Sequence, residues 1–242
     1  MDKVSFGFED VEPLEKTRRV GGVFASVAPR YDLMNDLMSG GLHRLWKSHF
    51  VRKLKPRRGE HILDMAGGTG DIAFRIAKSG AAVTIADINP EMLEVGRKRA
   101  ARRGILGLDW AVENAERLTF PDSSYNAYSI AFGIRNVTHI DQALAEAYRV
   151  LRIGGRFFCL EFSKTDWPGF AELYDLYAMK VVPRIGKAVA GDRDSYRYLV
   201  ESIERFPDMA RFSTMIGSAG FGQVRCEPIL GGLVAIHSGW KI

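Results

Sequence analysis

The chain has 242 residues, of which 46% are hydrophobic and 26% are charged, and its formal net charge is +5. This length fits one large domain, and these proportions are typical of a soluble globular protein. No transmembrane helix is expected, because no run of about 18 apolar residues occurs, and no signal peptide is expected, because the opening residues lack its apolar core. The two cysteines, Cys159 and Cys226, have no metal-site spacing, so a reducing cytoplasm is the expected compartment.

The N-terminal region is predicted to be irregular at first and helical afterwards. Residues 1–16 show no hydrophobic periodicity and are predicted to form an irregular arm, followed by one domain over residues 17–242. Apolar residues recur at helical spacing within the stretch 17–58. The helix predicted around residues 42–54 combines Leu45, Trp46 and Phe50 with basic side chains. This composition favours either an interfacial helix on an anionic membrane surface or a helix that packs on the core and turns a basic face to water.

A glycine-rich loop follows the first predicted strand, residues 61–65, and precedes a helix that begins near Asp71. The loop residues are Gly67, Gly68, Thr69 and Gly70. Glycine lets the backbone turn sharply and approach a ligand. A second strand, residues 82–86, ends in Asp87, where an acid can accept hydrogen bonds from a ribose. This pattern is typical of a nucleotide-type cofactor site.

Charge distinguishes between two kinds of cofactor. The segment 68–73 also fits the pattern G-x-G-x-x-A of dinucleotide-binding proteins, but a pyrophosphate needs backbone N–H groups and positive charge. Here the carboxylates of Asp64 and Asp71 flank the loop. S-adenosylmethionine carries no phosphate, and its ammonium and sulfonium groups suit neighbouring acids. The alternative is that Asp71 only complements the helix dipole and Asp64 only ends its strand.

Strands and helices continue to alternate along the chain. Further strands are predicted at residues 108–112, 128–132 and 156–162. Helices are predicted at residues 90–103 and 141–151. Two strand-like runs near the C-terminus, 223–227 and 232–237, are close enough in sequence to form an edge hairpin. This alternation predicts an α/β fold with a doubly wound, mostly parallel, seven-stranded sheet of the Rossmann-like kind.

The segment 163–206 interrupts this alternation. It is helical in pattern, rich in aromatic residues and contains no predicted strand. Because it follows the fifth strand, it belongs at the carboxyl edge of the sheet, where ligands bind. We expect either a helical lid over an apolar substrate or a helical layer that extends the core.

Several segments of the chain are distinctive: residues 27–36, 64–71, 86–90, 114–116, 132–137, 160–164 and 194–203. Together they closely resemble the ubiquinone/menaquinone biosynthesis C-methyltransferases. Most of them lie outside the glycine loop, so the resemblance is more specific than one to methyltransferases in general. One position departs from the family: Ala131 stands where many members have a serine, so no cofactor contact is assigned there.

The resemblance implies a class I methyltransferase. Such an enzyme transfers the methyl group of S-adenosylmethionine to a ring carbon of a polyprenylated benzoquinol, or of a naphthoquinol such as demethylmenaquinol. The resemblance assigns cofactor contacts to Thr69 and Asp87, and it places Asn114 and Ala115 at the adenine. With the acid-flanked loop, the expected cofactor residues are Gly67, Gly68, Thr69, Gly70, Asp87, Asn114 and Ala115.

Methylation of a ring carbon needs a deprotonated oxygen nearby, because the carbon is otherwise a poor nucleophile. Arg135 and Asn136 follow the fourth strand at the carboxyl edge. Arg135 is expected to stabilise the phenolate or to orient a water, and Asn136 to orient the quinol or that water. Tyr31, in the N-terminal motif, is expected to give or accept a proton. The alternatives are an arginine ion pair on the surface, an asparagine that caps a loop and a tyrosine in the core.

Three other functions compete with this interpretation. A short-chain NAD(P)-dependent oxidoreductase shares the sheet and the second-strand acid, but no tyrosine here is followed by a lysine four positions later. A methyltransferase with another acceptor, such as RNA or a sterol, remains open because of the basic stretches, although no aromatic RNA-binding motif accompanies them. A catalytically silent scaffold would not need the intact loop, Asp87 and Arg135.

We therefore expect a polyprenylated quinol as the substrate and no nucleic acid as a partner. The five histidines form no metal-spaced set, so no metal is expected. Because the quinol tail is apolar and no membrane-spanning segment is predicted, we expect a cytoplasmic chain, peripheral on the inner face of the membrane. A homodimer and contacts with other quinone-biosynthesis proteins remain open.

Overall fold

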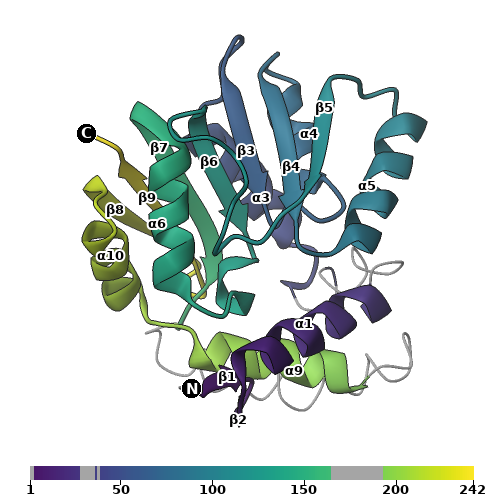
Figure 1. Ribbon diagram of the computed structural model, residues 1–242, viewed down its shortest axis with the longest axis vertical. Coiled ribbons are helices and arrows are strands. Elements are labelled where there is room, and N and C mark those ends of the chain that lie inside the picture. Colours follow the sequence, from purple (N-terminus) through teal and green to yellow (C-terminus); the bar gives the residue numbers. More distant parts are fainter. Residues whose placement is uncertain (1–2, 28–35, 37–38, 165–192) are drawn as a thin grey trace.

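The computed structural model describes residues 3–27, 36, 39–164 and 193–242, drawn as coloured ribbon in Figure 1. Tyr31 and most of the segment 163–206 lie outside these residues. The proton-transfer role of Tyr31 and the lid over the substrate therefore stay predictions.

A seven-stranded sheet forms the centre of the fold, in the strand order β5-β4-β3-β6-β7-β9-β8. Its strands are β3 (His61–Met65), β4 (Ala82–Asp87), β5 (Leu108–Val112), β6 (Tyr125–Ala131), β7 (Leu151–Phe162), β8 (Gly222–Ile229) and β9 (Val234–Trp240). The strands from β3 to β7 are parallel, whereas β9 pairs antiparallel with both β7 and β8. The predicted doubly wound, mostly parallel sheet with an edge hairpin is confirmed.

The strand order places the site. The chain runs outward from β3 to β4 and β5, and then returns to the other side of β3 with β6. The carboxyl ends of β3 and β6 therefore flank the point at which the strand order reverses, where open α/β sheets bind ligands. Most residues of β3, β6 and β7 are buried, because helices cover both faces of these strands.

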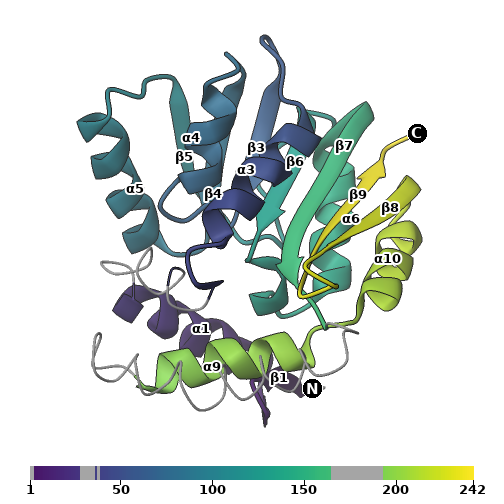
Figure 2. The same ribbon diagram turned by 180° about the vertical axis from the view of Figure 1, so that it is seen from behind.

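Helices lie on both faces of the sheet. On the face seen in Figure 1 lie α6 (Ile140–Val150) and α10 (Met209–Ser218). On the face seen in Figure 2 lie α3 (His43–Leu54), α4 (Asp71–Ala77) and α5 (Pro90–Arg102). Each face has its own apolar core, with Phe50 and Leu93 in one and Leu144 and Phe212 in the other.

Two further helices close the carboxyl end of the parallel strands. In both views α1 (Pro13–Val27) and α9 (Arg193–Arg205) lie side by side below this edge (Figures 1 and 2). The turn of Ile134–Asn136, which follows β6, contacts α9. The carboxyl edge is thus enclosed between the sheet and a pair of helices that come from opposite ends of the chain.

Residues predicted to form an irregular arm contain a hairpin, so the prediction for 1–16 is wrong. Its strands are β1 (Val4–Phe6) and β2 (Glu9–Val11), and α1 begins at Pro13. Strands of three residues are too short to show a periodicity. The hairpin is instead held by distant contacts: the Phe8 N–H donates to Glu201 at 3.2 Å, and the Phe6 ring stacks on Tyr198.

Most apolar side chains of α3 pack inside the protein, as in the second of the two predicted alternatives. Trp46 is 5% exposed and Phe50 is fully buried. Trp46 packs against the rings of Phe132 and Phe162. Leu45 remains 67% exposed, so only the start of the helix presents apolar surface to solvent.

Gly154 and Gly155 lie inside β7, which begins five residues before the predicted strand 156–162. The helix α6 ends at Val150, and β7 begins at the next residue. Gly154 has a φ of 77°, and the pairing of β7 with β6 shifts register in this region. The glycines therefore mark an irregularity in β7, which their turn-like composition concealed.

Candidate cofactor and acceptor site

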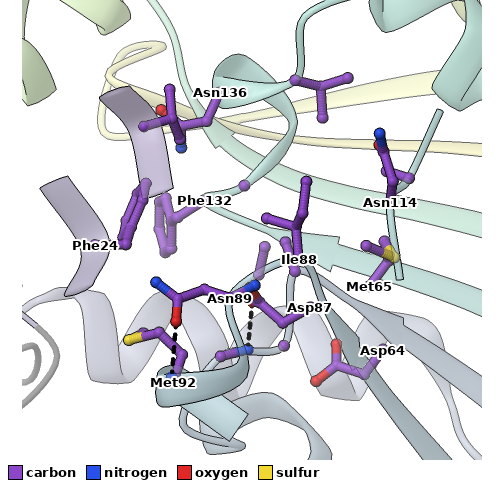
Figure 3. Close-up of a pocket in the computed structure, with 18 of the residues that line it drawn as sticks. Phe24, Asp64, Met65, Asp87, Ile88, Asn89, Met92, Asn114, Phe132 and Asn136 are labelled. Carbon is purple, nitrogen blue, oxygen red and sulfur yellow. Dashed lines mark hydrogen bonds between the residues drawn. The ribbon is translucent and has the colours of Figure 1, made fainter. Parts of the chain in front are cut away.

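A cavity at the carboxyl ends of β3, β4 and β6 brings most of the predicted site together (Figure 3). The predicted residues that line it are Gly67, Gly68, Thr69, Asp87, Asn114, Ala115 and Asn136. Gly70 is not part of this wall. Its φ of 84° lets the chain enter α4, and a Cβ there would lie 2.6 Å from the Phe74 ring. Gly70 therefore serves the turn rather than the cavity.

The glycine loop packs too closely on the sheet to hold a side chain at Gly67. A Cβ at this position would lie 2.7 Å from Ile85 and 2.9 Å from the carbonyl oxygen of Asp64. Gly68 has a φ of 50°, and its N–H donates to the Oδ2 of Asp87 at 2.9 Å. The loop backbone is thus held at the ends of β3 and β4, where it can approach a ligand closely.

Asp87 ends β4 with both carboxylate oxygens bonded to the backbone. Its Oδ1 accepts from the Asn89 N–H at 2.9 Å, and its Oδ2 accepts from Gly68. Burial raises the pKa of this carboxyl to about 6, and the backbone donors oppose the rise. Each carboxylate oxygen has a second acceptor site, so Asp87 can still accept the hydroxyls of a ribose.

Asp64, at the end of β3, contributes a buried acid to the cavity wall. It is 1% exposed, and its Oδ1 accepts from the Ser129 hydroxyl at 2.7 Å. Within the described part of the chain its Oδ2 has no hydrogen-bond partner. Burial raises the pKa of Asp64 to about 7. A buried carboxylate oxygen without a partner suits a cationic group of a ligand, since a buried charge needs a counter-charge or donors.

Lys47 is the cation among the described residues that line the cavity. Its Nζ donates to the Oδ2 of Asp71 at 2.9 Å, and its side chain is 5% exposed. Burial opposes ionisation of Asp71, but the neighbouring ammonium outweighs it and holds the pKa of this carboxyl below its usual value. Sequence reasoning missed Lys47 by counting it with a basic outer face. The available signal was its position between Trp46 and Phe50, on the side of α3 that faces the core.

Apolar side chains complete the cavity. They are Phe24 from α1, Ile88 just before α5, Met92 in the first turn of α5, and Phe132 after β6. Figure 3 shows Phe24 and Phe132 facing each other across one end and Ile88 beside Asp87. Flat apolar walls of this kind suit an adenine or another aromatic ring. These residues were not predicted, although Ile88 directly follows the second-strand acid.

Asn136 is the predicted catalytic residue that the structure brings to the cavity wall. Its Oδ1 accepts a hydrogen bond from the Tyr198 hydroxyl on α9 at 3.1 Å. Tyr198 was part of a family segment but had no predicted role. Its ring is 4% exposed.

Arg135 is not among the described residues that line this cavity, so its expected contact with the acceptor stays a prediction. Its Nη1 donates to Glu161 at 2.6 Å and to the Phe132 carbonyl at 2.9 Å, and its Nε donates to Ser202 at 3.3 Å. The side chains of Arg135 and Glu161 are 4% and 1% exposed. Burial raises the pKa of Glu161, and the guanidinium acts in the opposite direction. The predicted alternative, an arginine ion pair, thus describes the geometry, although the pair is buried rather than on the surface.

Comparison with known proteins identifies the family. The model of the ubiE/COQ5 methyltransferase family matches residues 13–241. A ubiquinone/menaquinone biosynthesis C-methyltransferase from Zymomonas mobilis is 68% identical over 242 residues and 100% of both chains. The mitochondrial 2-methoxy-6-polyprenyl-1,4-benzoquinol methylase of Arabidopsis thaliana is 53% identical, over 98% of this chain and 90% of that relative.

Solved structures of lower identity share the fold. A S-adenosylmethionine-dependent methyltransferase from Thermotoga maritima matches with a TM-score of 0.65 at 19% identity, over 91% of this chain and 99% of that one. A phosphoethanolamine N-methyltransferase of Haemonchus contortus, solved with S-adenosylmethionine, matches with a TM-score of 0.60 at 12% identity, over 81% and 52%. The chain therefore belongs to the ubiE/COQ5 methyltransferase family and is an S-adenosylmethionine-dependent C-methyltransferase.

Proposed function

We propose that the chain methylates a ring carbon of a polyprenylated benzoquinol, and of demethylmenaquinol as a second acceptor. The observation that carries this proposal is the cavity itself, in which buried acids and one lysine lie beside the polar turn of Asn136. The names of the relatives, which refer to ubiquinone and menaquinone biosynthesis, support the choice of acceptor.

The residues of the cavity fit S-adenosylmethionine group by group. The Oδ2 of Asp64, which has no partner in the described part of the chain, suits the ammonium group. Lys47 suits the carboxylate, Asp87 the ribose hydroxyls, and Ile88 and Met92 the faces of the adenine. When bound, the cofactor supplies a methyl group on a sulfonium centre.

The chain's own residues must then position the acceptor and stabilise its phenolate. Asn136 is a polar side chain of the same cavity as Phe24 and Phe132, and a donor directed at developing oxyanion charge contributes about 3 kcal/mol. Orienting the ring carbon toward the methyl group lowers the barrier further. Tyr31 is proposed to exchange the proton. Arg135 is proposed to hold the turn that carries Asn136 rather than to contact the acceptor.

The acceptor's tail implies contact with a bilayer. Among the described residues no helix is long and apolar enough to cross a membrane. Leu42 and Leu45 are 40% and 67% exposed at the start of α3, close in sequence to Lys47, which lines the cavity. We propose that this leucine pair, rather than the whole helix, meets the membrane surface. We also propose that the chain forms a homodimer and contacts other quinone-biosynthesis proteins.

A methylation assay tests the proposed function. Purified chain and S-adenosylmethionine are offered a demethylated polyprenyl benzoquinol, a demethylmenaquinol or transfer RNA, and the products are analysed by mass spectrometry. We expect a single methyl group on the ring carbon of at least the benzoquinol. Transfer to RNA, with neither quinol methylated, would overturn the proposal.

A further inference from the structure

One face of α9 supports two consecutive residues of the Ile134–Asn136 turn. Tyr198 and Ser202 are one helical turn apart, so their side chains lie on the same side of α9. The Tyr198 hydroxyl donates to the Oδ1 of Asn136, and the Ser202 hydroxyl accepts from the Nε of Arg135. The helix α9 thus holds both side chains of the turn, although more than 60 residues separate it from them.

The hydrogen bond from Tyr198 determines which end of the Asn136 amide is available. An asparagine amide has one oxygen acceptor and one NH₂ donor, and the two ends differ in what they offer a ligand. Because the Tyr198 hydroxyl engages the oxygen, the NH₂ group is left for the cavity. Figure 3 shows the nitrogen of Asn136 on the side of Phe24 and Phe132, within the pocket.

Two features keep Tyr198 in the donor role. Its ring stacks on Phe6 with centroids 4.2 Å apart and an interplanar angle of 17°. Burial raises the pKa of its hydroxyl, so the proton is retained throughout the range in which enzymes work. A protonated, immobile hydroxyl cannot act as a base, but it can orient the group to which it donates.

We propose that Tyr198 is a positioning residue, which fixes the Asn136 amide with its NH₂ group toward the acceptor's ring oxygen. This rests on the proposed methylation of a quinol. Asn136 then presents a donor to the phenolate, and the hydroxyl of Tyr198 acts only through Asn136. The family segment 194–203 acquires a function from this geometry, since its second tyrosine connects α9 to the cavity.

Steady-state kinetics of Tyr198→Phe test the proposal. The substitution keeps the ring and its stacking on Phe6, but it releases the Asn136 amide. We expect kcat to fall about three- to tenfold, the value of one intramolecular hydrogen bond, with an unchanged dissociation constant for S-adenosylmethionine by calorimetry. Tyr128→Phe is the matched control. Tyr128 is fully buried, and within the described chain its hydroxyl has no partner, so kcat should not change.

The double variant decides whether Tyr198 acts through Asn136. Asn136→Ala alone should lower kcat more than Tyr198→Phe, and adding Tyr198→Phe to it should cost nothing further. If Tyr198→Phe costs the same factor in both backgrounds, or none in the wild type, the positioning role is wrong while the proposed function stands. A wild-type chain that methylates no quinol would overturn both proposals.

Discussion

Two sides of the cavity are held in place by different kinds of contact: the cofactor side at Asp87 and the glycine loop, and the acceptor side at the turn of Arg135 and Asn136. On the cofactor side, Asp87 accepts hydrogen bonds from residues two and 19 positions away in the sequence. On the acceptor side, Arg135 bonds to Glu161 and Ser202, 26 and 67 positions away, and Asn136 bonds to Tyr198, 62 positions away. Asp87 and the glycine loop are therefore held within one strand–helix–strand unit. The turn that carries Asn136 instead depends on tertiary packing.

This difference implies that cofactor affinity and turnover are separable properties. Damage to the strand–loop–helix unit should weaken binding of S-adenosylmethionine and leave the bonds that hold Asn136 intact. Damage to the contacts of the turn should slow the reaction of a chain that still binds its cofactor.

The largest effect is expected for Glu161→Gln. The change leaves the Arg135 guanidinium buried without its counter-charge, and breaking a buried ion pair in this way costs about 3–5 kcal/mol of unfolding free energy. Urea denaturation measures the loss, and turnover of the remaining folded chain should also fall because the turn is released. Glu94→Gln is the control, since its pairs with Arg97 and Lys98 are exposed and are worth less than about 1 kcal/mol. If cofactor affinity falls as far as turnover does, the two sides are not separable.

Asp87→Ala should produce the opposite profile. The cofactor loses a charged hydrogen-bond acceptor, so calorimetry should show binding weakened by about 1.5–3 kcal/mol. At saturating cofactor, kcat should stay near that of the wild type. Asp109→Ala, at an exposed position on the neighbouring strand β5, is the control and should leave affinity unchanged. Unchanged affinity for Asp87→Ala would remove this residue from the cofactor side.

The pH dependence of cofactor binding should depend on Asp64. Its pKa is raised to about 7, and only the ionised form attracts the ammonium group. Affinity should therefore increase about tenfold between about pH 5.7 and pH 7, below the midpoint of about 7.7–8.0 at which an α-ammonium loses its proton. Asp64→Asn should abolish this slope. A slope that survives the substitution would assign the titration to another group, such as Asp87.

The raised pKa of Asp64 also implies that the unfolding free energy depends on pH. A raised pKa means that the folded state binds this proton more tightly than the unfolded state does. The stability linked to the proton is fully present below the ordinary pKa of 3.8 and is lost as the pH rises through about 7. Asp64→Asn should remove that loss, so its advantage in unfolding free energy over the wild type should be larger at high pH than at low pH. Denaturant titrations at both ends of the range measure the difference.

The smallest effect is expected at the membrane surface. Leu45→Ser should reduce co-sedimentation with anionic vesicles a few-fold, since one exposed leucine contributes at most about 1.5–3 kcal/mol on burial. Leu14→Ser is the control, because Leu14 is 86% exposed on α1 and is not part of the proposed contact. Turnover of a short-tailed, water-soluble quinol should not change in either variant. Equal losses of vesicle binding would show that exposed leucines act without regard to position.

The same contrast explains how much could be predicted from sequence. The sheet and the cofactor loop were predictable because their signals are local: apolar runs, glycines at sharp turns and an acid at a strand end. Asp87 and the loop lie where these signals placed them. Asn136 also reached the cavity, since it follows the end of β6 directly.

The rest could not be predicted because its causes lie far away in the sequence. Arg135 was expected at the acceptor, but its position is set by Glu161, whose charge is hidden in the apolar run of β7. Lys47 was counted with the basic surface, although α3 turns it toward the cavity. The hairpin over residues 4–11 has no periodicity of its own and exists because α9 offers it a surface.

The long-range contacts of that hairpin imply an order in which parts of the molecule fold. The Phe8 N–H donates to Glu201 across 193 positions of the chain, so β1 and β2 can dock only after α9 has formed. Contacts of such long range form late in folding, because closing the long loop between them costs entropy before the contact stabilises the fold. The hairpin should therefore be the first part of the described structure to detach, with amide protons that exchange faster than those of β3 and β6. Detachment would uncover the Tyr198 ring while the sheet stays folded. Docking of the hairpin on α9 therefore stabilises the acceptor side of the enzyme.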